Sequence, residues 1–260
     1  MYFIIINVPL HSQKNMQRYF IHLSYDGANY HGWQIQPNGS SVEETIEKAL
    51  TTLLRQPIDI TGAGRTDSGV NASCMVAHFD AAEGVVGDCA QLTFRLNRLL
   101  PCDIAISKIE PVDGDMHARF SATARTYHYY IHTEKDPFLR RYSWEVHYKL
   151  DFVLMTEAAH YLLGEKDFKC FCKAGADVKT TICNVTDAHF ERDKGSQYVF
   201  CITANRFLRN MVRAVVGTLI DVGRGRLTLD DFRRIVDSGS RSDAGESVPG
   251  YALFLSDIKY

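Results

Sequence analysis

The sequence has little that would indicate a membrane or secreted protein. Its 260 residues carry a formal net charge of only -2, and no apolar run approaches the roughly 20 residues that cross a bilayer. A short apolar stretch at residues 2–6 lacks a basic leader and a small-residue cleavage site. We therefore expect a cytoplasmic protein with no membrane partner. The weak net charge gives no global sign of a nucleic-acid partner, so only local clusters of positive charge could indicate one.

Cysteines are few and do not follow a ligand pattern. The seven cysteines are odd in number, and Cys170, Cys172 and Cys183 come closest to clustering, with His160 and His189 nearby. Zinc sites usually combine two closely spaced ligand pairs, and no second pair is present here. We therefore expect reduced thiols, no disulfide framework and no bound metal.

The apolar pattern predicts the order strand, helix, strand, strand, helix, strand, and predicts it twice. The expected strands are residues 19–24, 58–60, 74–79, 104–109, 126–132, 184–190, 198–203 and 251–258, and the expected helices are one capped by Ser40 or Ser41, then 88–100, 152–163, 206–222 and 229–237. This order is ferredoxin-like. It predicts an α+β fold in which two related halves join their sheets around one cleft.

The expected boundaries divide the chain into an extension and two halves. Residues 1–17 form the N-terminal extension, 18–115 the N-terminal ferredoxin-like half with the loop at 64–70, and 116–260 the C-terminal ferredoxin-like half with a basic helix. Residues 134–148 have the pattern of a connection between halves. Since no Ser/Gly-rich linker occurs, we expect the halves to pack together.

Residues 64–70 (GRTDSGV) place one carboxylate, Asp67, in a short glycine-flanked loop between apolar strands. Glycine allows close backbone approach, and loops at a sheet edge often carry catalytic groups. Asp67 is therefore a candidate catalytic residue, and Arg65 a candidate for substrate binding. The alternative is a turn aspartate that caps its own backbone. Nucleotide binding is disfavoured, because no Lys-Ser/Thr follows the glycines and a strand comes next.

Residues 125–130 (RTYHYY) are expected to form a strand on which Tyr127 and Tyr129 share one face. Tyrosine favours strands, so ordinary sheet packing is one interpretation. An aromatic face beside an arginine is also suited to stack on a displaced base. Tyr127 is therefore a candidate substrate-binding residue.

Residues 205–213 (NRFLRNMVR) predict a helix with Arg206, Arg209 and Arg213 on one side. A solvent-exposed helix face normally mixes both signs of charge. Here the charges are arginine alone, and Arg224 and Arg226 follow further along the chain. This concentration of positive charge indicates a phosphate-binding surface, with an ordinary solvated face as the alternative.

Four motifs in this order resemble the tRNA pseudouridine synthase A family, from about Arg18 to Tyr260. The motifs are Tyr25-Asp26-Gly27-x-x-Tyr30-x-Gly32-Trp33-Gln34, Gly64-Arg65-Thr66-Asp67-x-Gly69-Val70, Phe120-Ser121-Ala122-x-x-Arg125-x-Tyr127-x-Tyr129 and Phe207-x-x-x-Met211-Val212-Arg213-x-x-Val216-Gly217. One position departs from the family, which usually has histidine where this chain has Asn71. Asparagine keeps hydrogen-bonding capacity but cannot become cationic.

The resemblance implies a pseudouridine synthase fold, a homodimer and isomerisation of uridine in the anticodon stem-loop of tRNA, at the family's positions 38–40. It implies no cofactor and no metal. It assigns the essential aspartate to Asp67, the active-site tyrosine to Tyr127 and the arginine that pairs with the aspartate to Arg213. An arginine beside Asp67 would favour its ionised form. Two alternatives stay open: a non-catalytic RNA-binding protein that uses the same cleft, and a pseudouridine synthase that acts on another RNA.

Overall fold

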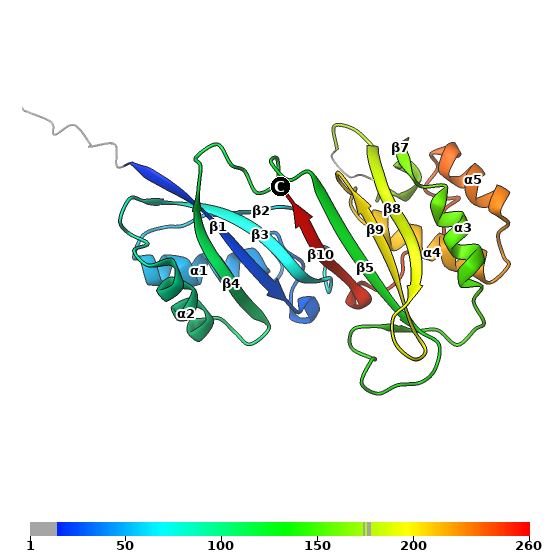
Figure 1. Ribbon diagram of the computed structural model, residues 1–260, viewed down its shortest axis with the longest axis horizontal. Helices are drawn as coiled ribbons and strands as arrows, with labels where there is room; N and C mark the ends of the chain where they lie inside the picture. Colours follow the sequence, from blue (N-terminus) through cyan, green and yellow to red (C-terminus); the bar gives the residue numbers. More distant parts are fainter. Residues whose placement is uncertain (1–14, 174, 176–177) are drawn as a thin grey trace, which may run out of the picture.

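The computed structural model describes residues 15–173, 175 and 178–260, so most of the predicted extension at 1–17 lies outside the described residues. Within this part of the chain, ten strands form one mostly antiparallel sheet accompanied by five α-helices (Figure 1). The sheet has the order β4-β1-β3-β10-β5-β9-β8-β7, with β2 paired to β3 and β6 paired to β5. The expected α+β class is therefore confirmed.

The N-terminal half has the strand order β4-β1-β3-β2. Its elements are β1 (Met16–Tyr25), α1 (Val42–Leu54), β2 (Ile60–Gly62), β3 (Asn71–Ala82), α2 (Cys89–Leu99) and β4 (Ile104–Val112). The start of α1 is set by Ser41, whose side chain accepts a hydrogen bond from the Glu44 amide, and the start of α2 by Asp88.

The C-terminal half has the corresponding order β10-β5-β9-β8, with β7 added at the edge. Its elements are β5 (Ala124–His132), β6 (Trp144–Glu145), α3 (Phe152–His160), β7 (Gly164–Asp167), β8 (Ile182–Arg192), β9 (Gln197–Ala204), α4 (Met211–Gly223), α5 (Leu229–Ser238) and β10 (Leu253–Lys259). Asp151 caps α3, and Thr228 with Asp231 forms a capping box on α5.

The two halves meet where β10 runs parallel to β3, with Phe254 opposite Asn71 and Leu255 opposite Ala72. In Figure 1, β10 therefore lies in the middle of the sheet, between the strands of the two halves. Buried side chains of both halves form a continuous hydrophobic core within the described residues. Since β3 begins directly after residue 70, this joint places the loop at 64–70 between the halves.

Helix α4 begins later than the sequence pattern predicted. It starts at Met211, and its N-cap Asn210 has a φ of 65°, a left-handed conformation that cannot continue a helix backwards. The Asn210 side chain donates to Ser247 Oγ at 2.6 Å, which fixes this conformation. The expected helix over 206–210 is therefore wrong: Arg206 and Arg209 lie in the connection between β9 and α4, and do not share a helix face with Arg213.

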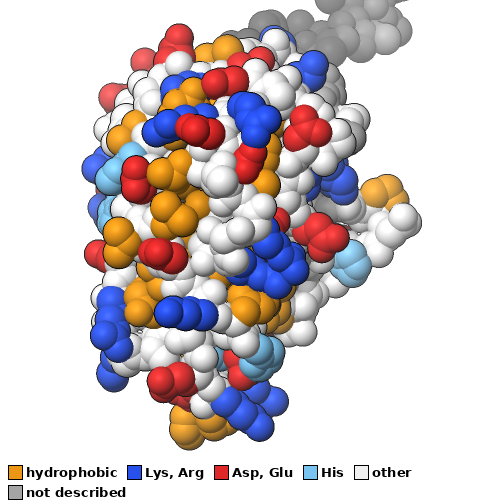
Figure 2. All heavy atoms as spheres, turned by 90° about the vertical axis from the view of Figure 1, so that its right-hand side faces the viewer, with side chains coloured by type: hydrophobic (Ala, Val, Ile, Leu, Met, Phe, Trp, Pro, Cys, Tyr) orange, Lys and Arg blue, Asp and Glu red, His pale blue; other side chains and the backbone are white. Residues whose placement is uncertain are grey.

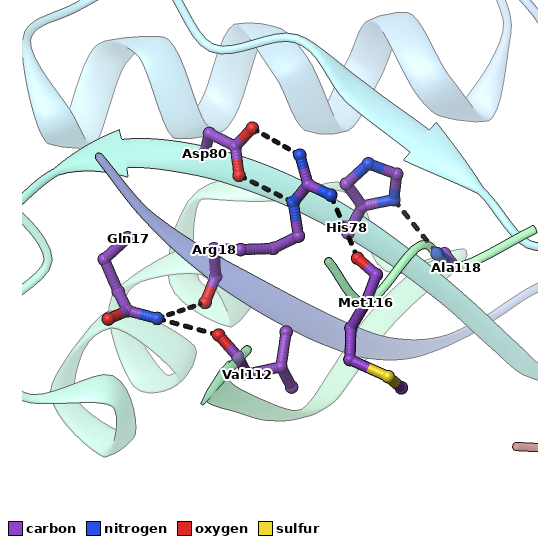
Figure 3. Close-up of polar contacts among 7 residues, drawn as sticks. All are labelled: Gln17, Arg18, His78, Asp80, Val112, Met116 and Ala118. Carbon is purple, nitrogen blue, oxygen red and sulfur yellow. Dashed lines mark hydrogen bonds and ion pairs between the residues drawn. The ribbon is translucent and has the colours of Figure 1, made fainter. Parts of the chain in front are cut away.

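The link between the halves is residues 113–123, between β4 and β5, and not 134–148 as expected. Figure 3 shows how this link is held against β1 and β3. Arg18 forms two 2.8 Å hydrogen bonds with the Asp80 carboxylate and donates to the Met116 carbonyl at 3.0 Å. The Ala118 amide donates to His78 Nδ1 at 3.2 Å. These contacts fix the path of the chain between the halves.

Residues 134–148 instead follow β5 within the C-terminal half. This segment nevertheless reaches the N-terminal half, because Arg141 forms a 2.9 Å ion pair with Asp26 and the Tyr142 hydroxyl donates to the same carboxylate at 3.0 Å. In the part of the chain that the structure describes, no helix has the length and apolarity needed to cross a membrane.

Candidate active site

Asp67 lies in the loop between β2 and β3, and its neighbour Thr66 anchors this loop. The Thr66 carbonyl accepts a hydrogen bond from the Trp33 amide at 3.3 Å, and its hydroxyl lies 2.9 Å from the Tyr25 hydroxyl. Gly32 has a φ of +93°, and a Cβ there would come within 2.3 Å of the Thr66 carbonyl oxygen. Only glycine fits this close approach. The first motif therefore shapes the loop that presents Asp67.

Arg213 brings a positive charge from the C-terminal half to Asp67. Its Nη1 lies 3.4 Å from Asp67 Oδ2, while its Nε donates to the Val248 carbonyl at 2.7 Å. The two paired side chains are 22% and 26% exposed, respectively. Asp67 is thus held at the joint between the halves and is still open to a ligand.

Tyr127 lies on β5, opposite Leu255 of β10 and Ile202 of β9. Its side chain is buried, and its ring meets Phe207 edge to face with centroids 5.0 Å apart. Burial raises the pKa of the Tyr127 hydroxyl, and the negative charge of Asp67 raises it further, so the hydroxyl is protonated at neutral pH. Among the described residues, this hydroxyl makes no hydrogen bond, which leaves it available to a ligand near Asp67.

Asn71 serves as a neutral bridge between three segments of the chain. It is 1% exposed, its Oδ1 accepts from the Gly27 amide at 2.9 Å, and its Nδ2 donates to the Tyr251 carbonyl at 2.7 Å. These contacts connect the first motif, the start of β3 and the segment before β10. Because the side chain both accepts and donates hydrogen bonds, its observed role needs no positive charge.

Arg125 is a further residue at the site, and its role could not be derived from the sequence pattern. Its guanidinium donates to the carbonyls of Ala63, Asn205, Ala122 and Arg119 at 2.5–2.9 Å. It thereby connects the start of the Asp67 loop to the end of β9. The signals in the sequence were its place two residues before Tyr127 and its position in the third family motif.

Three of the predicted binding arginines lie in the loop of Asp67 or in the connection that leads into α4. Arg65 and Arg209 are exposed, and Arg206 is partly exposed. Among the described residues, none of the three forms an ion pair or a side-chain hydrogen bond. Their positive charges are therefore available to an anionic ligand.

Arg224 and Arg226 lie at the opposite end of α4. The length of this 13-residue helix separates them from Arg213 by roughly 15–20 Å, at 1.5 Å per residue. The Arg224 guanidinium lies 4.0 Å from the centre of the Tyr148 ring, and Arg226 Nη1 lies 3.4 Å from Asp221 Oδ1. The predicted arginines thus form two separate groups.

The outer face of the C-terminal half, where α3, α5 and the edge strand β7 lie, does not carry a uniformly positive surface (Figures 1 and 2). In Figure 2 the side chains of acidic and basic residues are interspersed there, and on α5 Arg233 and Arg234 pair with Asp230 and Asp231. A groove of about 380 Å³ lies between α3 and strands β8 and β9, lined by Phe152, Val153, Thr156, Glu157, His160, Phe190, Glu191, Arg192 and Tyr198. None of the candidate site residues lines it.

The cysteines singled out in the sequence are free thiols. Cys170, Cys172 and Cys183 are buried. A different set, His189, Glu191 and Cys201 on β8 and β9, has possible ligand atoms within 4.8 Å of one another. None of these residues contacts Asp67 or Arg213 in the described part of the chain.

Comparison with known proteins identifies the family. The family model described as tRNA pseudouridine synthase matches residues 21–121 and 158–260. The tRNA pseudouridine synthase A of Bacteroides thetaiotaomicron is 54% identical over 247 residues, which cover 94% of this chain and 91% of the relative. That of Bacteroides fragilis is 54% identical, covering 95% and 97%, and that of Acetivibrio thermocellus is 41% identical, covering 92% and 97%. The family expected from the four motifs is thus confirmed, and the chain belongs to the tRNA pseudouridine synthase family.

Proposed function

We propose that this protein converts uridine to pseudouridine in the anticodon stem-loop of tRNA, at positions 38–40, with Asp67 as the catalytic carboxylate. The observation that supports this most directly is the Asp67–Arg213 pair at the joint between the halves, 3.4 Å between Nη1 and Oδ2. The carboxylate is partly exposed and is near the buried Tyr127. This arrangement suits a base that has left its stack and entered a confined site.

The residues of the site match the demands of the reaction. The N1–C1′ bond of uridine must break, the base must turn, and C5 must bond to C1′ and lose its proton while N1 gains one. The rearrangement involves no net oxidation or reduction, so it needs no redox cofactor. Asp67 can begin it as a nucleophile at the sugar or the base, or as a base that removes the 2′ proton. The Tyr127 ring can stack on the displaced base, and its hydroxyl is a candidate for the final proton transfer.

The two groups of arginines form the proposed contacts to the tRNA. Arg65 lies in the loop of Asp67 and is assigned to the substrate nucleotide, while Arg206 and Arg209 are assigned to backbone phosphates. Arg224 and Arg226 are assigned to phosphates further along the tRNA, because the length of α4 separates them from the catalytic site.

The proposed organisation is a homodimer of chains with two ferredoxin-like halves, 18–115 and 116–260, that works in the cytoplasm, where tRNA is its partner. The matching strand orders β4-β1-β3-β2 and β10-β5-β9-β8 support the assignment of the halves. A dimer would place a second copy of the arginines beside the first and lengthen the positive track. The mass of the free protein in solution tests the dimer directly.

The decisive experiment uses tRNA transcripts labelled with tritium at C5 of uridine, because pseudouridine formation releases that tritium to water. Transcripts in which cytidine replaces uridine at position 38, 39 or 40 locate the reaction. We expect tritium release that depends on these positions and is lost in Asp67→Asn. Release from other structured RNAs but not from tRNA would assign the enzyme to a different substrate. RNA binding without any release would indicate a non-catalytic protein.

A further inference from the structure

Phe120 is a large apolar side chain held in an exposed position. It lies in the link between the halves and is 77% exposed. Its ring lies 4.3 Å from the His117 ring, centre to centre, and the Arg119 guanidinium lies 5.8 Å from its centre. The exposed face of an aromatic ring beside a cation is the kind of surface on which unpaired nucleobases stack.

The backbone that carries Phe120 is fixed by two imidazoles that act as acceptors. The Ala118 amide donates to His78 Nδ1 at 3.2 Å, as Figure 3 shows. The Arg119 and Phe120 amides both donate to His117 Nδ1, at 3.1 and 3.3 Å. A further hydrogen bond, from the Tyr260 hydroxyl to the Ala118 carbonyl at 2.8 Å, holds the other side of the turn. The exposure of Phe120 is therefore set by a turn whose amides at Ala118, Arg119 and Phe120 are all hydrogen-bonded.

One guanidinium connects this turn to the active site. Arg125 Nη2 donates both to the Arg119 carbonyl and to the Ala63 carbonyl, so these two carbonyls converge on a single nitrogen. Ala63 precedes Asp67 by four residues, and Arg125 precedes Tyr127 by two on β5. The turn is thus positioned relative to both proposed active-site residues.

The surroundings of Phe120 are positively charged. Burial lowers the pKa of Arg125, the tyrosines at 260 and 127 oppose this in part, and the positive charges of Arg119 and Arg206 lie close enough to lower it as well. Within the described residues, no carboxylate pairs with Arg119 or Arg206. Because an apolar protein partner would have to desolvate these charges, the surface is better matched to RNA, which supplies bases and phosphates together.

We propose that Phe120 is a stacking platform for an unpaired nucleobase of the tRNA substrate, next to the nucleotide that enters the Asp67 site, with Arg119 contacting the adjoining phosphate. This inference rests on the proposed function and adds a binding site to it. Stacking there holds the opened strand in place while the target uridine is out of its stack.

The test compares Phe120→Ala, Phe120→Trp and, as a control, Phe94→Ala, which removes a 67% exposed ring from α2. We expect Phe120→Ala to weaken binding of the anticodon-arm hairpin by roughly 5- to 150-fold, the range for loss of one base–aromatic stack. KM for tRNA should rise in parallel, while kcat at saturating tRNA changes much less. Phe120→Trp should restore both quantities, and Phe94→Ala should bind as the parent protein does.

A fluorescent base identifies the stacked nucleotide. Hairpins carrying 2-aminopurine at single successive loop positions should show quenching at one position, lost in Phe120→Ala and retained in Phe120→Trp. Arg119→Ala should lower the salt slope of log K by roughly 0.7 to 0.9, whereas Phe120→Ala should leave the slope unchanged. Parent-like binding by Phe120→Ala would overturn the proposal, and so would equal impairment in the alanine and tryptophan variants. The proposal would also fail if Phe120→Ala no longer formed the dimer and this change explained its weaker binding. The binding and fluorescence measurements do not require turnover. Absence of tritium release would therefore refute the proposed function without refuting the binding site at Phe120.

Discussion

Arg213 contacts both the Asp67 carboxylate and the Val248 carbonyl, through different nitrogens of one guanidinium. Nη1 lies 3.4 Å from Asp67 Oδ2, and Nε lies 2.7 Å from the Val248 oxygen. The second contact fixes the orientation of the guanidinium, so that its charge points at the carboxylate. Since Asp67 belongs to one half and Arg213 to the other, the proposed site is complete only when the halves are docked.

Replacement of Asp67 by asparagine should abolish turnover while leaving folding and tRNA binding nearly intact. The amide is close to isosteric with the carboxylate but cannot act as a nucleophile or a base in the first step. Tritium release, thermal unfolding and hairpin binding measured on the same preparation check this. Activity above a few per cent of the parent value would contradict the assignment of Asp67.

Tyr127 can be tested in two steps, because its ring and its hydroxyl have different proposed tasks. Tyr127→Phe keeps the ring that packs on Phe207 and removes the hydroxyl, so it should fold and bind normally yet turn over slowly. Tyr127→Leu removes both and should also weaken binding. Rate measurements at saturating tRNA distinguish the two effects, and full activity in both variants would show that Tyr127 only packs.

The exposed arginines before α4 should differ from Arg213 in their effects. Arg206→Ala and Arg209→Ala should each weaken tRNA binding and lower the salt slope of log K by roughly 0.7 to 0.9, without changing which uridine reacts. Arg213→Ala should instead reduce turnover more than affinity, because its charge is directed at Asp67. Filter retention across a salt series, with the site of modification mapped in parallel, makes the comparison. Unchanged salt slopes in both variants would show that neither Arg206 nor Arg209 contacts a phosphate.

The order of the elements could be predicted because it depends on local patterns. Alternating apolar residues predicted the long strands, and the sequence offered Ser40 or Ser41 as the cap of the first helix, of which the structure uses Ser41. The second helix was expected near residue 88 without an assigned cap, and the structure shows Asp88 in that role. The start of α4 could not be predicted, because residues 206–210 have a helical pattern that the left-handed Asn210 and its bond to Ser247 override. Strand β7 (Gly164–Asp167) was missed because it is short and has no apolar alternation.

The site was predictable where its residues form local motifs and not where they act across the fold. Asp67 stands out because glycines surround it within one loop. The proximity of Arg213 came only from the family resemblance, since 146 residues separate the pair. Both contacts of Asn71, and the contacts of Arg125 with Ala63 and Asn205, depend on backbone groups far away in the sequence, and no spacing rule indicates them.

Asn71 offers a test of the joint between the halves. Asn71→Ala would leave the Gly27 amide and the Tyr251 carbonyl without their present partner, and an unsatisfied buried group costs about 1–3 kcal/mol. We expect a lower free energy of unfolding and slower turnover, since the loop before β3 would lose its support. Asn71→His, the residue usual in the family, should retain more stability than alanine. Urea unfolding of both variants is the measurement, and equal stability of alanine and parent would show that the bridge is dispensable.

His78 should make the stability of the protein depend on pH. Burial, with the positive charges of Arg18 and His117, lowers its pKa to about 4, and Asp80 opposes this only in part. The unfolded chain titrates near 6.5, so between about pH 6.5 and 4 the unfolded state binds more protons and stability falls as the pH falls. Below about pH 4 the loss from His78 levels off, and the paired carboxylate of Asp80, whose pKa Arg18 lowers, begins to lose its own contribution. Thermal unfolding across this range should show the decline, and His78→Gln, whose amide oxygen can still accept from Ala118, should make it shallower. An equal slope in the two proteins would mean that His78 is not the group responsible.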